Sequence, residues 1–173
     1  MLMADTGILI LRFVVGLYVA AHGAQKLFGW FDGPGLHGTI GAMGGGLGFR
    51  PASLWVTVLT LAEVVGGTLM VLGFLGPIGP LAVAGAMLGA VLFGHWSNGP
   101  FSGKGGYELA ATNLGAALAV ALLGVGQFSV DAWLGIVLPQ TVGVVFAALV
   151  LLGVLAAALS RRPHAAPTIE ATH

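Results

Sequence analysis

The sequence contains no cysteine, and only 7% of its 173 residues are charged. The lack of thiols excludes disulfide scaffolds, thiol redox relays, thiolate zinc sites and protein-ligated iron–sulfur clusters. Soluble domains carry about 25% charged residues, so this chain cannot cover a water-facing surface. Six basic and six acidic residues give a formal net charge of zero, and no nucleic-acid partner is expected because no basic field would attract one.

Apolar and small residues, by contrast, are abundant. Hydrophobic residues make up 57% of the chain, which also has thirty glycines, and the mean hydropathy is +1.00. Glycine is common where membrane helices pack backbone against backbone. The composition therefore predicts an all-α polytopic membrane protein, embedded in a lipid bilayer, with a single transmembrane domain over residues 1–160.

Five segments are long and apolar enough to be candidate membrane spans, since about 20 apolar residues cross a bilayer. They are residues 6–28, 52–75, 78–94, 107–125 and 139–159. The prolines at 77 and 80 predict a tight hairpin between the second and third spans, because proline is tolerated in the first turn of a helix. Residues 161–173 have no apolar period and predict a disordered cytoplasmic tail.

The basic residues are distributed unevenly about these spans. With five spans, five of the six fall on the side of the C-terminal tail: Lys26, Arg50, Lys104, Arg161 and Arg162. The positive-inside rule then predicts a cytoplasmic C-terminus and an external N-terminus in a bacterial-type plasma membrane. On the cytoplasmic side, the spacing of Leu36, Ile40, Met43 and Leu47 predicts a short helix at the membrane interface.

Two charged residues lie deep in the predicted spans. A charge at the centre of a membrane helix costs about 2.5–3.5 kcal/mol, so each needs a partner, water or a function. Arg12 and Glu63 are predicted at similar depths, and a structural ion pair between them would neutralise both. A functional proton or ligand site at Glu63 is the alternative interpretation, and the sequence leaves both open.

A second group of polar side chains is predicted at the cytoplasmic ends of the first, third and fourth spans. Its members are His22, Lys26, His95, Tyr107 and Glu108. Structural explanations exist for several of them. Lys26 can extend to the lipid headgroups, Glu108 can stabilise a helix N-terminus, and Tyr107 can belong to an interfacial aromatic belt.

The same residues can also be interpreted as a quinone site. His22, Gln25, Lys26, His95, Tyr107 and Asn113 are the candidate cofactor-binding residues. Glu108, His22 and Glu63 are the candidate catalytic residues, since each can hold or transfer a proton. His22 and His95 could alternatively ligate a haem b, and the spacing of the polar residues predicts no other metal site.

Several short motifs in this order resemble the DoxX family of small membrane proteins. They are His22-Gly-Ala-Gln-Lys-Leu-Phe-Gly-Trp30, Leu61-Ala-Glu-Val-Val-Gly-Gly67, His95-Trp-Ser-Asn-Gly99, Gly105-Gly-Tyr-Glu-Leu109 and Gly126-Gln-Phe-Ser-Val-Asp131. The resemblance implies a four-helix transmembrane bundle and a role in respiratory or sulfur-related redox chemistry. It also implies that Glu63 and Glu108 are characteristic positions, and relatives include a subunit of thiosulfate:quinone oxidoreductase.

The chain departs from the family pattern in two places. Gly76-Pro77 replaces a basic residue that many members carry after the second span, and a hydrophobic segment follows Asp131 where shorter members stop. The second departure predicts a fifth transmembrane helix at the C-terminus, which could form a surface for a second membrane subunit or for a homo-oligomer.

Three functions are compatible with these observations. The first is a membrane subunit of a quinone-linked oxidoreductase system, related to sulfur or oxidative-stress chemistry. The second is a non-catalytic anchor or assembly factor for soluble redox enzymes, favoured by the lack of a built-in redox group. The third is a small-solute transporter that uses Arg12 and Glu63, and the absence of a clear inverted repeat disfavours it.

Overall fold

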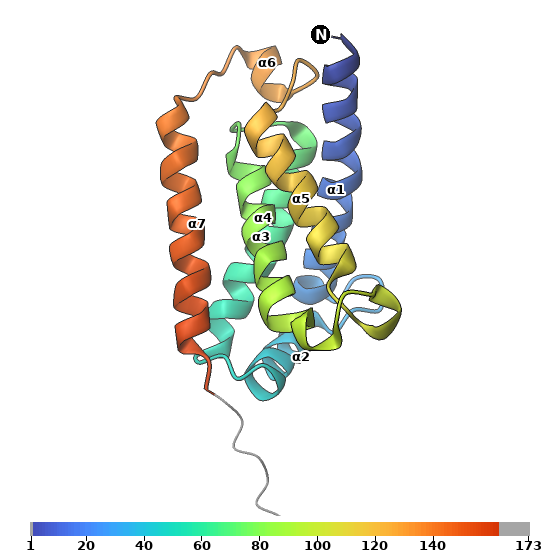
Figure 1. Ribbon diagram of the computed structural model, residues 1–173, viewed down its shortest axis with the longest axis vertical. Coiled ribbons are helices and arrows are strands. Elements are labelled where there is room, and N and C mark those ends of the chain that lie inside the picture. The colour runs from blue at the N-terminus through green and yellow to red at the C-terminus, as the bar shows by residue number, and fades with distance from the viewer. Residues whose placement is uncertain (1, 163–173) are drawn as a thin grey trace, which may run out of the picture.

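The computed structural model describes residues 2–162, which form helices joined by short loops, with no strand in that range. In chain order the elements are α1 (Leu2–Phe28), α2 (Gly35–Gly41), η1 (Ala42–Gly46), α3 (Ala52–Leu72), α4 (Ile78–Gly89), η2 (Ala90–His95), η3 (Trp96–Asn98), η4 (Ser102–Lys104), α5 (Glu108–Leu123), α6 (Val130–Leu134) and α7 (Gln140–Ser160). The predicted all-α architecture is confirmed (Figure 1). Four of the five predicted spans correspond to α1, α3, α5 and α7, and the third corresponds to α4 continued by η2.

By length and hydropathy, four helical segments of residues 2–162 can cross a membrane: α1, α3, the continuous run Ile78–Asn98, and α7. The fifth helix, α5, has 16 residues and a length of about 24 Å at 1.5 Å per residue. That is shorter than the roughly 30 Å of a hydrocarbon core. Of the helices at the five predicted spans, α5 is therefore too short to cross the hydrocarbon core along its axis. The C-terminal segment forms α7, which is long enough to cross it.

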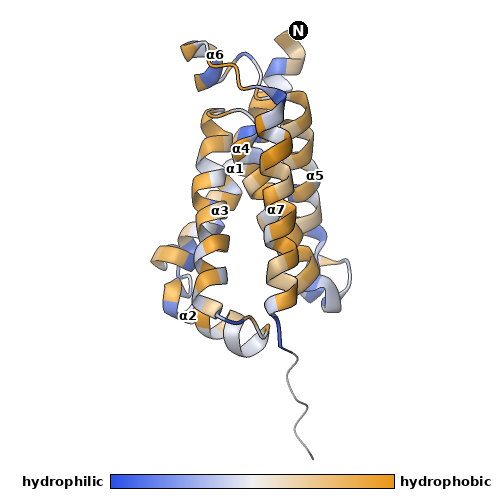
Figure 2. Cartoon of the chain, turned by 90° about the vertical axis from the view of Figure 1, so that its left-hand side faces the viewer, coloured by the Kyte–Doolittle hydropathy of each residue, from blue (hydrophilic) through white to orange (hydrophobic). Residues whose placement is uncertain are grey.

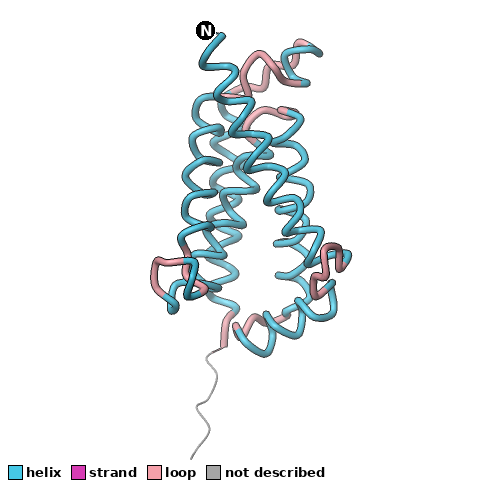
Figure 3. The backbone as a smooth tube through the Cα atoms, turned by 90° about the vertical axis from the view of Figure 1, so that its right-hand side faces the viewer, coloured by secondary structure: helices cyan, strands magenta, loops and turns pink. Residues whose placement is uncertain are grey.

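Helices α1, α3, α4 and α5 form the bundle, and α7 stands beside it, packed on α4 (Figure 1). The long helices run side by side, with loops and short helical segments at the two ends of the bundle (Figure 3). The bundle core is apolar and includes Val19, Met70, Val83, Ala117 and Val120, each at most 1% exposed. Helix α7 is little covered by the rest of the protein, since only 6% of its most apolar 18-residue stretch is buried. A helix that is apolar all round and so little covered by protein is suited to a lipid environment.

Two adjacent glycines place α3 between its neighbours. A Cβ atom on Gly67 would lie 2.7 Å from the carbonyl oxygen of Gly16 on α1, and one on Gly66 would lie 2.8 Å from Cβ of Ala82 on α4. Both distances are too short for a side chain, so these glycines allow the helices to approach at the backbone. Close packing at small residues is a main source of helix association in membranes, as the high glycine content predicts.

At one end of the bundle, α6 and the turn between α3 and α4 lie near the N-terminus, as Figure 1 shows. The backbone amides of Leu75 and Gly76 in that turn donate to the carboxylate of Asp131, at 3.0 and 2.6 Å. Asp131 is 5% exposed. Its two oxygens thus satisfy buried backbone donors, which would otherwise cost free energy.

At the opposite end, α2 and η1 form the short helix that the apolar stripe predicts. The end of α7 is held against the segment that follows η1: Arg162 N donates to Gly48 O, and Arg161 Nε donates to Leu47 O, both at 2.9 Å. These two arginines begin the predicted disordered tail, yet both make specific contacts. The remainder of that tail, 163–173, lies outside the described residues.

Candidate functional site

A buried ion pair joins α1 to α3. Lys26 Nζ lies 2.5 Å from Glu63 Oε1, and the two side chains are 27% and 1% exposed. The close approach of the helices is possible because Gly23 faces Glu63 and Val64. The second carboxylate oxygen of Glu63, Oε2, is buried and has no hydrogen-bond partner among residues 2–162. Glu63 therefore keeps a free acceptor inside the bundle.

The predicted ion pair between Arg12 and Glu63 is wrong, because Arg12 binds backbone carbonyls. Its guanidinium donates to the oxygens of Met70, Val71, Val125 and Phe128 at 2.6–2.9 Å, and the residue is 1% exposed. Met70 and Val71 lie in the last turn of α3, where unpaired carbonyls and the helix dipole favour a cation. Arg12 thus ties α1 to the end of α3 and to the loop after α5.

A cavity of about 710 Å³ lies between α3, α4 and α7. On α7 it extends from Phe146 to Ala157, a length of about 16 Å at 1.5 Å per residue. Figure 2 views the molecule from this side, where α3 and α7 separate towards the end that carries α2. The wall of the cavity is almost entirely aliphatic and aromatic, and the polar exceptions are Lys26, Thr39, Trp55 and His95.

Two of the predicted cofactor-binding residues therefore share one cavity. Lys26 reaches it from α1 and His95 from η2. Lys26 joins the cavity to Glu63 behind it, because its ammonium is bound to Glu63 Oε1. The ammonium has three donors, so it can bind Glu63 and a ligand in the cavity together.

The hydrogen bond of His95 determines which of its nitrogens carries the proton. His95 Nδ1 lies 2.8 Å from the carbonyl oxygen of Gly105, and a carbonyl can only accept. Nδ1 therefore carries the hydrogen, so Nε2 is an acceptor in the neutral ring and a donor only in the imidazolium. Asn98 Nδ2 donates to the same carbonyl at 3.1 Å, which fixes the loop that orients the histidine.

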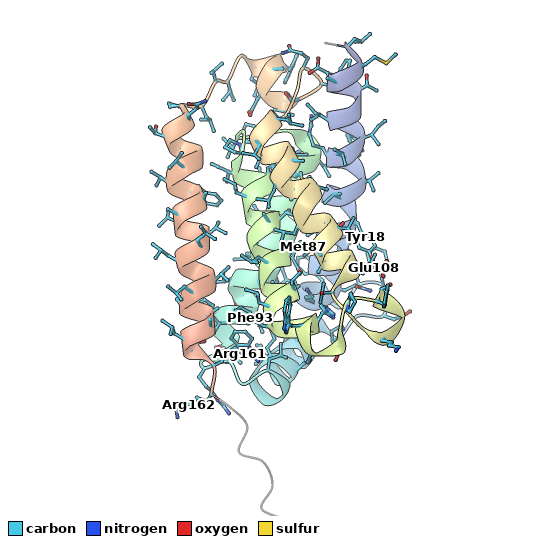
Figure 4. The ribbon with its side chains drawn as sticks, in the orientation of Figure 1. Tyr18, Met87, Phe93, Glu108, Arg161 and Arg162 are labelled. Carbon is cyan, nitrogen blue, oxygen red and sulfur yellow. The ribbon has the colours of Figure 1, made fainter. Side chains whose placement is uncertain are left out.

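Glu108 is bound within the loop that precedes α5, and not to His22. Its Oε2 accepts from the backbone amide and the hydroxyl of Ser102, both at 3.0 Å. The residue is exposed and projects on the side of the bundle away from α7 (Figure 4). No hydrogen bond or ion pair between Glu108 and the predicted partners occurs in residues 2–162, and Glu108 does not line the cavity. Its predicted proton transfer stays a prediction.

The other predicted site residues also lie away from the cavity. The ring of His22 packs edge-on against Tyr18, with ring centroids 4.6 Å apart, and Gln25 Nε2 donates to Phe31 O at 3.4 Å. Tyr107 stacks on Trp96 at 5.2 Å, and Asn113 is half-buried on α5. His22 does not line the cavity that His95 lines, so this cavity does not offer the paired imidazoles that a haem b needs.

The sequence alone did not indicate Trp55 as a site residue. It lies in the first turns of α3, lines the cavity, and its buried indole Nε1 has no hydrogen-bond partner among residues 2–162. A buried indole usually finds an acceptor. In the sequence Trp55 is one more aromatic residue near a membrane interface, a position where tryptophan is common for other reasons.

Residues 7–96 match the family model described as DoxX, which is more than half of the chain. The chain belongs to the DoxX family. The matched region of this DoxX protein contains most of α1 and all of α3, α4 and η2, and with them Lys26, Trp55, Glu63 and His95. Helix α7, which closes one side of the cavity, lies beyond the match. No curated protein and no solved structure shows a significant match to the chain.

Proposed function

We propose that this DoxX protein is a membrane subunit of a quinone-linked oxidoreductase system and binds its quinone in the cavity between α3, α4 and α7. The observation that carries the proposal is a largely apolar cavity of about 710 Å³ with a few convergent polar groups, Lys26, Trp55 and His95. Ligand sites have this character, with volumes of about 300–1,000 Å³ and a small number of polar groups that orient the ligand.

The lining of the cavity suits both parts of a quinone, its polar ring and its apolar tail. A quinone ring carries carbonyl oxygens, which accept hydrogen bonds, and the ammonium of Lys26 and the indole of Trp55 are donors. The isoprenoid tail is apolar and fits the aliphatic wall between α3 and α7, which extends over about 16 Å of α7. A ring at the end with Lys26 and a tail towards Phe146 would satisfy both.

The residues around the ring can also hold protons. A bound quinone supplies two-electron, two-proton carrier chemistry. Neutral His95 accepts a proton at Nε2 while Nδ1 remains bound to Gly105 O, and Glu63 has a free acceptor at Oε2 next to Lys26. We propose His95 and the Lys26–Glu63 pair as the groups that exchange protons at the ring. The electron donor would be a soluble partner or a second subunit.

The test is binding of decylubiquinone to the purified protein in lipid nanodiscs, measured by quenching of tryptophan fluorescence. Gly153 lines the cavity, and a Cβ atom there meets open space, so Gly153→Leu should fill the cavity without a clash. Gly115→Leu is the matched control, since Gly115 also faces open space but does not line the cavity. We expect Gly153→Leu to weaken binding at least tenfold, roughly 1.4 kcal/mol, and Gly115→Leu to bind as the wild type does.

Equal binding by both variants would contradict the proposed site, and no saturable binding by the wild type would contradict the proposed function. The anchor hypothesis predicts the second outcome together with a soluble protein that co-purifies. Extraction of lipids from the purified protein provides an independent measurement, because a resident quinone would appear in the extract.

A further inference from the structure

A second cavity, of about 370 Å³, lies at the inner end of α7, the end that carries α2 and η1. It is bounded by the 46–48 segment after η1, by Phe93, and by Ala158, Arg161 and Arg162. Leu47 and Phe93 also line the larger cavity, so the two share a wall. Unlike its neighbour, this cavity has two arginines in its lining.

Arg161 is held in place by three groups. Its Nε donates to Leu47 O at 2.9 Å, and its guanidinium carbon lies 5.5 Å and 5.2 Å from the ring centroids of Phe49 and Phe93. Figure 4 shows Arg161 close to Phe93 at the end of α7. Only one of five guanidinium N–H groups is used by Leu47, so the remaining donors are available to an anion at a fixed position.

No carboxylate neutralises these arginines within residues 2–162, where the Lys26–Glu63 pair is the one salt bridge. Arg162 is exposed, and its backbone amide binds Gly48 O. A cavity that holds two cations with no carboxylate partner among the described residues 2–162 has the charge that an anionic group requires.

The position of the cavity along the membrane normal identifies the source of that anion. Helix α7 has 21 residues, about 32 Å in length, which matches the roughly 30 Å of a hydrocarbon core. The two arginines follow its last residue and therefore lie at the level of the lipid phosphates. Leu155 and Leu159, which are 54% and 78% exposed on the last turns of α7, provide an apolar surface for acyl chains beside them.

We propose that this second cavity binds the phosphate of an anionic phospholipid, with the acyl chains on the exposed surface of α7. Basic pockets beside membrane helices bind such headgroups. The site is independent of the quinone proposal, since it uses Arg161 and Arg162 where the quinone site uses Lys26, Trp55 and His95. A bound headgroup would also cover Phe93 and Leu47 at the inner end of the larger cavity.

The experiment is native mass spectrometry of the delipidated full-length protein, offered phosphatidylglycerol and phosphatidylcholine in equal amounts. Each basic side chain near an anionic lipid contributes about fivefold in affinity, so two predict a preference of about twenty-five-fold for phosphatidylglycerol. The double variant Arg161→Gln and Arg162→Gln should lose this preference. Arg50→Gln is the matched control, because Arg50 is exposed and does not line the cavity; it should keep the preference.

If the double variant fails to fold, Arg162→Gln alone provides the test, since its side chain is exposed, and about a fivefold loss is expected. Equal adducts of both lipids on the wild type would overturn the proposal. So would an equal loss with Arg50→Gln, which would indicate general surface charge. Displacement of phosphatidylglycerol by inorganic phosphate would assign the cavity to a soluble anion instead. Arg162→Gln should leave decylubiquinone binding unchanged, so either proposal can fail without the other.

Discussion

The ammonium of Lys26 lies 2.5 Å from Oε1 of Glu63, and this contact connects the cavity to the interior of the bundle. Lys26 lines the cavity, whereas Glu63 is 1% exposed and lies between α1 and α3. One side chain therefore lines the cavity, and the other is buried in contact with it. A change at either residue should affect both the stability of the bundle and the ligand site.

Loss of Lys26 should destabilise the protein more than loss of Glu63. Lys26→Met leaves a buried carboxylate without its counter-ion, and removal of one partner from a buried pair costs about 3–5 kcal/mol. We expect the lower end of that range, because Lys26 is 27% exposed. Glu63→Gln should cost less, since the Lys26 side chain can then extend to the headgroups.

Thermal unfolding in detergent, followed by size-exclusion recovery, measures this order. The double variant Lys26→Met and Glu63→Gln should be more stable than Lys26→Met alone, because no uncompensated charge remains. Strictly additive effects of the two substitutions would show that the contact contributes nothing to stability.

Gly73 should tolerate alanine much less well than Gly135. Both glycines have left-handed backbones, with φ of +62° and +67°, and alanine costs roughly 1–2 kcal/mol in that conformation. A Cβ atom at Gly73 would also overlap the guanidinium of Arg12, whereas one at Gly135 meets open space. The extra loss of stability in Gly73→Ala, measured by thermal unfolding, reports the clash with Arg12 and with Cβ of Ser129, which the added atom would approach to 2.6 Å. Similar losses in the two variants would mean that Arg12 and Ser129 both move aside freely.

Alanine should have different effects at two glycines of the membrane helices. At Gly67 the added methyl would lie 2.7 Å from the carbonyl oxygen of Gly16, so α1 and α3 must separate and close packing is lost. At Gly115 the methyl meets open space, and a gain of up to about 1 kcal/mol in helix propensity is expected. The unfolding temperatures should therefore shift in opposite directions. A stabilised Gly67→Ala would contradict the packing at this interface.

The orientation predicted by the positive-inside rule can be measured directly, because the chain has no cysteine of its own. Single substitutions Gly103→Cys and Leu134→Cys place thiols at exposed positions at opposite ends of the bundle. A membrane-impermeant maleimide should label Leu134→Cys in intact cells and Gly103→Cys only after permeabilisation. The reverse pattern would invert the predicted topology.

The sequence alone predicted the class of fold and the long helices. Spans are encoded locally, because a run of apolar residues at 1.5 Å per residue must match the thickness of the bilayer whatever its neighbours are. The same local information predicted a helix at the apolar stripe of Leu36, Ile40, Met43 and Leu47, and the abundance of glycine predicted close packing between helices. The family resemblance, carried by short motifs, is confirmed by the match over residues 7–96.

The tertiary structure decided which polar groups meet. Distance along a helix estimates the depth of a side chain, but the register between two helices is set where their backbones touch, here at Gly16 against Gly67 and at Gly23 against Val64. That register places Arg12 beside the end of α3, where it binds the carbonyl oxygens of Met70 and Val71. It places Lys26 beside Glu63, and these two side chains form the ion pair. Similarly, the cavity exists only because α7 packs on α4 at a distance from α3, a contact between segments far apart in the chain that no local pattern encodes.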